Sequence, residues 1–345
     1  MAGFEFTKYV TYEDTGSIIA IRGLNCKNGS LDLRDVKYID NSDFSKLSRS
    51  KLYVGDILYT YVGTVGEVAV VDKNDKYYLA PNVSRIRLSK DYNSDFIKQL
   101  LGSKKFYNKI VFPLIATSSQ PALSMENLRR FKLRVPSIKE QNKIASLFNA
   151  IDERIATQNK IIDKLQSLIK GIAQKIVRSN KPNVRLSECL ECNSSTLQES
   201  DVCEHGTYPV YGANGIVGYL NNYNTEGEAV YIIKDGSGVG TVSYFTGKCS
   251  ATGTLNTLQA KEGYSLQYLY YLLKVFNFEP YKTGMAIPHI YFKDYGKAKV
   301  FCPSYTEQLR YARLLSTIDN KLSEEQHILT NLSLQKQYLL RQMFI

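Results

Sequence analysis

The chain has 345 residues, six cysteines, no tryptophan and a formal net charge of +11 at pH 7. This length suffices for two domains with their own cores, and no apolar run reaches the about 18 residues that span a membrane. The N-terminal MAGFEFTKYV lacks the basic-then-apolar profile of a signal peptide, and the scattered cysteines do not suggest a disulfide framework. We therefore expect a cytoplasmic protein with an anionic partner, most commonly nucleic acid, although a merely basic surface would give the same charge.

The first third of the chain is predicted to be a globular domain, residues 1–135. A glycine-containing stretch, YVGTVGEVAV at 61–70, precedes a helical pattern that starts at Ser94. The segment SSQPALS follows, and the alternating FKLRV at 131–135 favours a strand.

A long helix is predicted next, within residues 136–180. Ser137 as N-cap and Glu140 three residues later form a capping box after a proline. Apolar residues then recur with the spacing of four and three that is typical of a coiled-coil seam. The seam positions that recur every seven residues include Phe148, Ile155, Ile162 and Ile169.

The second half repeats the first in the same order. GSGVGTVSYF at 236–245 resembles 61–70, a helical pattern starts at Ser265, MAIPHIY carries the second proline, and KAKVF at 297–301 is the second alternating strand. CPSYTEQLRYARLLSTIDNKL (302–322) then matches VPSIKEQNKIASLFNAIDERI (135–155) at eight of 21 positions. Four landmarks at a nearly constant offset indicate a duplicated unit.

The duplication predicts an α+β protein in which two similar globular domains are joined by two long helices. We expect domains at 1–135 and 181–302 and helices within 136–180 and 303–345. The second helix has its own seam, Leu315, Leu322 and Leu329. Since neither helix can bury its stripe alone, we expect an antiparallel coiled coil with a pseudo-twofold axis; two separate helical hairpins are the alternative.

Motifs of catalytic chemistry are missing from the sequence. GSGVG at 236–240 lacks the lysine of a nucleotide-binding loop, so a tight hairpin turn is the favoured interpretation. Cys189, Cys192, Cys203 and His205 could ligate zinc in principle, but the Cys-x-His spacing is poor for a structural site. We therefore predict no catalytic residues and no metal site. The positive charge lies mainly in residues 1–135, with 21 Lys and Arg against 14 Asp and Glu.

Together these motifs resemble the specificity (S) subunit of type I restriction-modification systems, over nearly the whole chain. The two Pro-Ser helix starts resemble the central and distal conserved helices of that family. GTYPVYGANGIVGYLNNY (206–223) followed by DGSGVGTV is similar to a common second target-recognition domain. IAIRGLNCKNGSLDL, GDILYTYVGTVGEVAVV and TSSQPALSMENLRRFKLRVP are similar to a common first one. The opening MAGFEF departs from the family, whose members usually have a longer segment before the IRGLN region.

The resemblance implies a non-catalytic DNA-recognition subunit in a bacterial defence system. Each domain would read one half of a gapped double-stranded DNA target, and the coiled coil would set the gap. Two methyltransferase (M) subunits and restriction/translocase (R) subunits would be the partners. The chain itself would bind no cofactor, whereas the partners would use S-adenosylmethionine, ATP and Mg. The alternative is an orphan coiled-coil scaffold with little DNA binding of its own.

The candidate DNA contacts are polar and aromatic side chains of loops at matching places in the two halves. In the first half they are Arg22, Asn25, Lys27, Tyr59, Tyr61, Ser118, Ser119 and Gln120. In the second half they are Tyr211, Asn214, Lys234, Asp235, Ser237, Lys282, Thr283 and His289.

Overall fold

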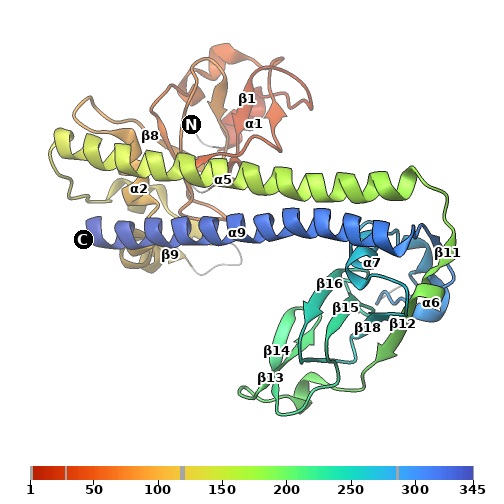
Figure 1. The fold of residues 1–345 in the computed structure, drawn as a ribbon. Helices are drawn as coiled ribbons and strands as arrows, with labels where there is room; N and C mark the ends of the chain where they lie inside the picture. The colour runs from red at the N-terminus through yellow and green to blue at the C-terminus, as the bar shows by residue number, and fades with distance from the viewer. Residues whose placement is uncertain (1–2, 28, 117–120, 285–286, 345) are drawn as a thin grey trace. The chain divides into compact units, whose positions relative to one another are not determined.

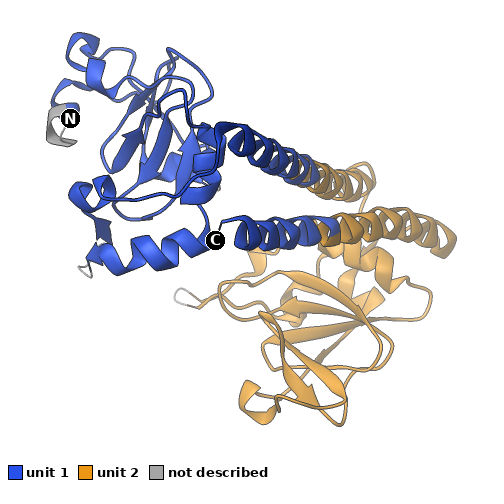
Figure 2. Ribbon diagram, turned by 90° about the vertical axis from the view of Figure 1, so that its left-hand side faces the viewer, with its two compact units in different colours: residues 1–158, 328–345 blue, residues 159–327 orange. Residues whose placement is uncertain are grey.

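The computed structural model describes residues 3–27, 29–116, 121–284 and 287–344. It divides into two compact units, residues 1–158 with 328–345 and residues 159–327 (Figure 2). Both predicted long helices are present, α5 over Ile138–Arg178 and α9 over Tyr305–Met343 (Figure 1). The boundary between the units falls inside both helices, so each unit contains one stretch of each. Among the described residues, no helix is both long and apolar enough to cross a membrane.

Unit 1 contains two three-stranded sheets with the strand orders β4-β1-β7 and β6-β5-β8. In the first, β1 pairs antiparallel with β4 and parallel with β7, whereas all pairs in the second are antiparallel. All four residues of the central strand β5 are buried, as expected for a strand with neighbours on both edges and a covered face. The strands are β1 Ile19–Ile21, β4 Lys37–Tyr38, β5 Ile57–Thr60, β6 Val68–Val70, β7 Tyr77–Leu79 and β8 Val83–Ile86.

Unit 2 contains sheets with the orders β14-β13-β17 and β12-β18-β15-β16. In the first of these sheets, β13 pairs antiparallel with β14 and parallel with β17, as β1 does with β4 and β7 in unit 1. The other sheet is antiparallel throughout and centres on the buried β15. The strands are β12 Leu190–Ser194, β13 Tyr208–Gly212, β14 Gly215–Leu220, β15 Glu228–Ile233, β16 Val242–Thr246, β17 Ser250–Ala251 and β18 Leu255–Ala260.

The two units therefore share one topology, which agrees with the duplication inferred from the sequence. They differ at one sheet edge, because β12 lies beside β18 in unit 2, whereas in the described part of unit 1 the sheet ends at β8.

The remaining elements of unit 1 are α1 Gly3–Tyr9, η1 Gly23–Asn25, β2 Cys26–Lys27, β3 Ser30–Leu31, η2 Phe44–Lys46, η3 Ser48–Ser50, α2 Ser94–Leu101, α3 Lys104–Phe106, η4 Tyr107–Val111, η5 Phe112–Leu114, β9 Ile115–Ala116, β10 Ala122–Leu123 and α4 Met125–Arg129. Those of unit 2 are β11 Val184–Arg185, α6 Leu186–Cys189, η6 Glu199–Asp201, α7 Leu266–Leu273, η7 Glu279–Tyr281, α8 Phe292–Tyr295 and β19 Lys299–Val300.

A short helix fastens the sheets of unit 1 to α5 through one buried glutamine. Gln141 is 1% exposed, and its side-chain Oε1 accepts a hydrogen bond from the backbone N of Asn93, the N-cap of α2, at 3.0 Å. Its Nε2 donates to the carbonyl oxygen of Pro136 at 2.9 Å. About three helical turns further along α5, Asp152 Oδ2 accepts from Gln99 Nε2 of α2 at 2.9 Å. These contacts fix both ends of α2 against the long helix.

Unit 2 repeats this fastening between α7 and α9. Gln308, 2% exposed, accepts from the backbone N of Ser265 at 2.9 Å and donates to the carbonyl oxygen of Pro303 at 2.9 Å. Asp319 Oδ2 accepts from the hydroxyl of Tyr271 at 3.2 Å. Burial, reinforced by the negative charge of Asp319, raises the pKa of Tyr271, so this hydroxyl keeps its proton and remains a donor. The glutamines and the aspartates both lie at the offset of the sequence repeat.

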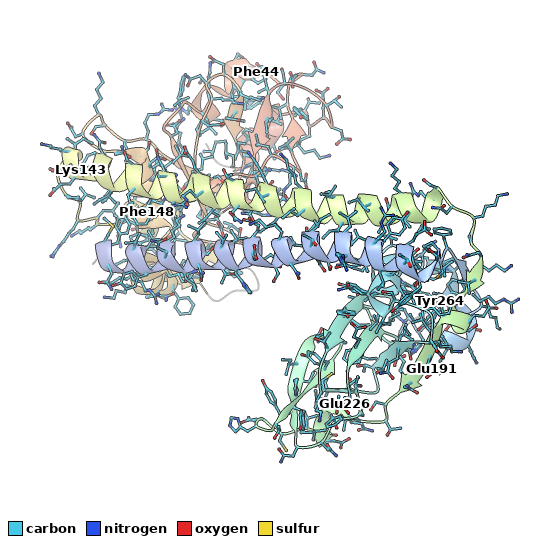
Figure 3. All side chains as sticks on the ribbon, in the orientation of Figure 1. Phe44, Lys143, Phe148, Glu191, Glu226 and Tyr264 are labelled. Carbon is cyan, nitrogen blue, oxygen red and sulfur yellow. The ribbon has the colours of Figure 1, made fainter. Side chains whose placement is uncertain are left out.

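The long helices pack on each other in an antiparallel sense within unit 1. Phe148 of α5 is labelled in Figure 3. Its ring stacks on that of Phe344, which follows α9, with ring centroids 5.9 Å apart. Four residues later, Asp152 forms an ion pair of 2.5 Å with Lys336, eight residues earlier in the chain than Phe344. Phe148 also belongs to the same core as Phe96 of α2, so this core joins both helices to the sheets.

In unit 2, the end of α5 lies against the start of α9 and against α7. Ala173 and Ile176 of α5, Leu315 of α9 and Tyr268 of α7 line one small internal cavity. The predicted seam residues are buried or half-buried: Phe148, Ile155, Ile162, Ile169, Leu315, Leu322 and Leu329.

Two local predictions need adjustment. The strand expected at 131–135 is absent from this described segment. Phe131 and Leu133 pack on the core, but no described strand pairs with them, whereas the counterpart in unit 2, β19, pairs with β11.

At the start of α5, the Ser137 backbone N donates to Glu140 Oε2 at 3.1 Å, which is the glutamate half of the predicted capping box. The Ser137 hydroxyl also donates to this carboxylate, at 2.8 Å.

We predict that Gln141→Leu destabilises unit 1 by about 1–2 kcal/mol, because the Asn93 backbone N and the Pro136 carbonyl oxygen lose their partner in partly buried contacts. The matched control is Gln166→Leu at an exposed position of the same helix, which we expect to change stability by less than about 0.5 kcal/mol. Urea-induced unfolding of both variants measures the difference, and equal midpoints would contradict the fastening role of Gln141.

Candidate nucleic-acid interface

A junction between two loops lies at the end of the antiparallel sheet in unit 1. The turn between β5 and β6 meets the segment that leads into β10. The backbone N of Gly63 donates to Pro121 O at 2.9 Å, and Leu123 N donates to Tyr61 O at 2.8 Å. Between these bonds, Val62 and Ala122 form an antiparallel bridge. We call residues 61–66 and 121–123 the unit 1 junction.

The same junction occurs in unit 2, between the β15–β16 turn and the segment before α8. Gly236 N donates to Pro288 O at 3.0 Å, and Ile290 N donates to Lys234 O at 2.9 Å. Asp235 and His289 form the bridge between them. We call residues 234–240 and 287–290 the unit 2 junction. In the sequence, the glycine-containing turn and the proline segment of each half are far apart. In the fold, these two segments pair with each other in both units.

Glycines close both turns because the backbone and the space require them. Gly66 and Gly240 have φ angles of 98° and 90°, in the region that side chains avoid. A Cβ atom at Gly66 would also lie 2.7 Å from the Tyr107 ring, and one at Gly240 would lie 3.2 Å from Phe278. The glycine-rich GSGVG is therefore a hairpin turn, as the sequence favoured.

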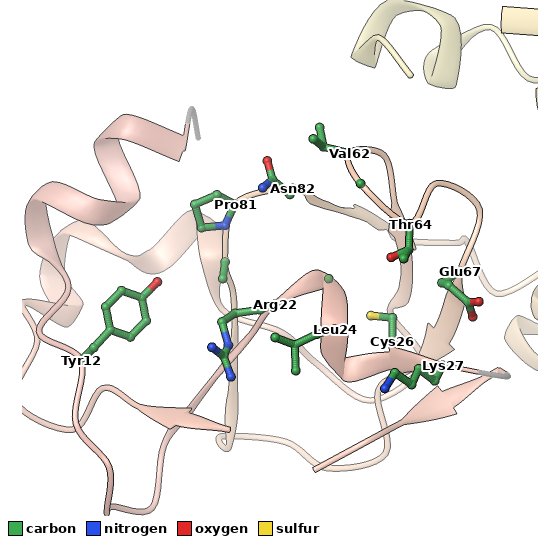
Figure 4. Close-up of a pocket in the computed structure, with 13 residues that line it drawn as sticks. Tyr12, Arg22, Leu24, Cys26, Lys27, Val62, Thr64, Glu67, Pro81 and Asn82 are labelled. Carbon is green, nitrogen blue, oxygen red and sulfur yellow. The ribbon is translucent and has the colours of Figure 1, made fainter. Parts of the chain in front are cut away.

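An open cleft of about 630 Å³ borders the unit 1 junction (Figure 4). Arg22 and Lys27 lie along it, together with residues 62–64 of the junction. Arg22 Nη2 forms an ion pair with Asp35 Oδ1 at 2.9 Å, and its buried Nε has no hydrogen-bond partner among the described residues. The cleft thus combines guanidinium and ammonium groups with a backbone that turns tightly beside them.

Carboxylates partly neutralise the cations of this cleft. Lys27 Nζ lies 3.6 Å from Asp32 Oδ2, and its side chain is half exposed. A hydrogen bond from the Arg34 guanidinium holds the pKa of Asp32 well below its ordinary value, so this carboxylate stays ionised at neutral pH. An incoming phosphate would therefore compete with Asp32 for Lys27.

Two predicted contacts of the first half have fully buried side chains in this structure. Asn25 is 0% exposed and organises its own loop: Oδ1 accepts from Arg22 N at 3.0 Å, and Nδ2 donates to the carbonyl oxygens of Asp32 and Asp35 at 2.9 and 2.7 Å. Tyr59 is also 0% exposed, within the core behind β5. Tyr61 is half-buried against that core. Ser118, Ser119 and Gln120 lie outside the described residues.

In the second half, three predicted residues meet at the junction. His289 Nδ1 lies 2.6 Å from Asp235 Oδ1, and the backbones of His289 and Thr283 exchange hydrogen bonds of 2.8 and 2.9 Å. Ser237 is exposed in the turn beside them.

The other predicted residues of the second half are dispersed. Asn214 is exposed in the β13–β14 turn, and Lys282 forms an ion pair with Glu279 at 2.6 Å. Tyr211 packs on Phe245, with ring centroids 4.0 Å apart, in an apolar cluster, so its ring supports the sheet.

The sequence interpretation missed two residues beside the unit 2 junction. Tyr291 and Lys293 line a cavity of about 300 Å³ together with Lys234, and Lys293 Nζ lies 5.2 Å from the centroid of the Tyr291 ring. Tyr291 is 47% exposed. The aromatic and basic HIYFKDY that follows Pro288 was the available signal, since exposed aromatic and cationic side chains suit nucleic-acid surfaces.

The cysteines do not gather into a site. Cys189 is buried, whereas Cys203 is exposed. Within the ranges that the structure describes, His, Cys, Asp and Glu side chains nowhere form a group of three that could hold a metal ion.

A family model matches nearly all of the chain. Residues 10–167 and 179–333 each match the type I restriction modification DNA specificity domain. The chain therefore belongs to the family of type I restriction-modification specificity proteins, as the sequence motifs suggested.

Three curated relatives carry specificity-subunit names. The putative type I restriction enzyme MjaX specificity subunit of Methanocaldococcus jannaschii is 24% identical over 155 residues, covering 43% of this chain and 36% of the relative. The type I restriction enzyme EcoKI specificity subunit of Escherichia coli is 25% identical over 169 residues, covering 46% and 36%. The putative type I specificity subunit S.MgeORF438P of Mycoplasma genitalium is 24% identical over 310 residues, covering 82% and 79%. The matched part is thus only about a third of the length of the first two.

Solved structures share the fold. The crystal structure of a type I restriction-modification S subunit from M. genitalium superimposes with a TM-score of 0.67 at 18% identity, covering 98% of this chain and 91% of that one. A structure described as the basis of complex assembly and conformational transition of the type I R-M system gives a TM-score of 0.53 at 15% identity, with coverages of 99% and 93%.

We predict that Asn25→Ala destabilises unit 1 by about 2 kcal/mol, because the Arg22 backbone N and the Asp32 carbonyl oxygen lose their partner, whereas the Asp35 carbonyl keeps its hydrogen bond from Arg22 Nη2. Asn214→Ala is the matched control, since Asn214 is an exposed asparagine in a turn of unit 2. Thermal unfolding distinguishes the two, and an unchanged Asn25→Ala midpoint would contradict its assignment as a structural residue.

Proposed function

We propose that this chain is the non-catalytic DNA-recognition subunit of a type I restriction-modification complex and reads a gapped, two-part DNA sequence. The observation that carries the proposal is the junction, which two units of one family build with the same backbone hydrogen bonds. Each unit would address one half-site. In this assignment, residues 1–135 and 181–302 are the target-recognition domains, and 136–180 and 303–345 are the conserved helices.

The side chains on this shared backbone favour two different half-sites. The equivalent bridge is formed by Val62 and Ala122 in unit 1 and by Asp235 and His289 in unit 2. Base edges in the major groove differ in their hydrogen-bonding groups and in the thymine methyl, so apolar and polar side chains at one position select different bases. Duplex DNA offers each of two similar domains an equivalent groove one or more helical turns apart.

DNA methylation and cleavage would belong to separate subunits. We propose methyltransferase and restriction/translocase subunits as partners, which would use S-adenosylmethionine, ATP and Mg, while this chain binds no cofactor of its own. A complex that acts on chromosomal DNA would work in the cytoplasm.

Equivalent exposed apolar side chains on the long helices support two copies of one partner. Unit 1 exposes Ile138, Leu147 and Ile328, and unit 2 exposes their counterparts Tyr305, Leu314 and Ile161, each between 37% and 51% accessible. Because the same positions are exposed in both units, they favour a contact that each unit makes once. We assign them to the methyltransferase subunits, one for each unit.

This assignment predicts a graded loss of partner binding. Leu147→Asp should reduce the bound methyltransferase from two copies to one, and Leu147→Asp with Leu314→Asp should abolish binding, because a charge is placed in each apolar contact. Native mass spectrometry of the co-expressed complex counts the copies. The matched control is Ser146→Asp, an exposed neighbour of Leu147. Two bound copies in the double variant would rule this surface out.

DNA binding should depend on salt through phosphate contacts. In the assembled complex, the logarithm of the binding constant should fall linearly with the logarithm of salt concentration, with a slope of about −0.9 per neutralised phosphate. Lys27→Ala should make this slope shallower by about 0.9, which is the contribution of one phosphate contact. It should also weaken binding to all sequences alike. Lys164→Ala, an exposed lysine on α5, is the control. Binding that is independent of salt would contradict the proposed function.

A further inference from the structure

We propose that His289, oriented by Asp235, reads a base edge in the second half-site and that the pair recognises the exocyclic amino group of adenine or cytosine. This inference rests on the proposed function, because it assigns a ligand group to one of the two proposed reading junctions.

Both residues are positioned by the backbone of the unit 2 junction. Asp235 follows β15, and His289 lies 54 residues later, before α8; the two form an antiparallel bridge. Their side chains meet at 2.6 Å between Nδ1 and Oδ1, and each side chain remains about a third exposed, 35% for His289 and 34% for Asp235. The pair is therefore ordered by the fold and still accessible to a ligand.

The hydrogen bond determines which atoms remain for the ligand. An ionised carboxylate only accepts, so His289 donates from Nδ1 and its Nε2 is left over. Gly284 passes close to another side of the ring, where an added Cβ atom would lie 3.1 Å from His289 Cδ2. In the neutral ring Nε2 is an acceptor, on the edge of the ring away from Asp235, and Asp235 Oδ2 is a separate acceptor.

Acceptors such as Nε2 and a carboxylate oxygen suit an amino group and not a phosphate. In the major groove, adenine N6 and cytosine N4 are the donors, and a carboxylate accepting from cytosine N4 is an established pairing. A phosphate next to Asp235 would be repelled by the carboxylate. The chemistry of the pair therefore points to a base edge.

The unit 1 junction shows that the pair is not needed to hold the loops together. There the equivalent bridge is formed by Val62 and Ala122, and the flanking backbone bonds of 2.9 and 2.8 Å match those of 3.0 and 2.9 Å in unit 2. The backbone of the junction therefore forms without an aspartate–histidine hydrogen bond. In unit 2 this pair is free to serve recognition. In unit 1, the same place offers apolar contact, which suits a thymine methyl group.

The test uses His289→Ala, and Asp235→Val with His289→Ala, which copies the unit 1 pair. Each variant is expressed with the methyltransferase partner, the methylated motif is sequenced, and competition binding to duplexes changed at each base pair of that motif gives the discrimination. We expect discrimination at one adenine- or cytosine-containing position of the second half-site to fall roughly five- to 150-fold, while the first half-site is unchanged.

Asp235→Asn tests whether the ring proton must lie on Nδ1. An amide can donate to Nδ1, which leaves the proton on Nε2 and turns the proposed acceptor into a donor. We therefore expect Asp235→Asn and Asp235→Val both to lose discrimination at this position, and unchanged discrimination in both would contradict a role of Asp235 in recognition. Circular dichroism of each variant checks that the fold is kept, as the alanine at position 122 leads us to expect.

Three results would overturn the inference. In the first, His289→Ala recognises the second half-site as the wild type does. In the second, His289→Ala binds every sequence more weakly by the same factor. In the third, His289→Ala loses discrimination in the first half-site. All three presuppose that the wild-type complex methylates a two-part motif; if the wild type has no such motif, the proposed function itself fails, and the two failures are thereby distinguished.

Discussion

In each unit, one buried glutamine in the first turn of a long helix holds the globular part to that helix by binding the N-cap of a short helix. Gln141 and Gln308 each satisfy a backbone N of the short helix and the carbonyl oxygen of the proline that precedes the long helix. These hydrogen bonds lie in partly or fully buried contacts, so leaving one of the groups without a partner costs free energy. The direction in which the sheets leave each helix, and with it the place of each junction, depends on this contact.

Making that contact twice allows the two junctions to differ without changing the scaffold. Their backbone bonds and glycine turns are shared, so selection can alter side chains such as those of Val62 and Asp235 without disturbing the core. Recognition of a two-part target by a single chain needs this separation, since the half-sites must be able to change while the support for partner subunits stays constant. The polar pair in unit 2 and the apolar pair in unit 1 fit such a division.

The sequence predicted the long helices well, because a seam of Phe148, Ile155 and Ile162 repeats over many turns and needs no knowledge of distant contacts. It also predicted that 61–70 and 236–245 are equivalent. It did not indicate that Asn25 and Tyr59 are buried, since the burial of a side chain depends on which segments cover it. The strand expected at 131–135 failed for a related reason: alternation indicates a face to bury, but a strand forms only beside a partner. Asp235 and His289 were both proposed as contacts, yet their pairing across 54 residues became visible only in the fold.

The central claim is that two units with one scaffold read two different half-sites. Methylation sequencing of DNA from a host without other methyltransferases, expressing this chain with its methyltransferase partner, tests it most directly. The account predicts one motif with two short, unlike half-sites separated by unread base pairs. A continuous motif, or two identical half-sites, would contradict it.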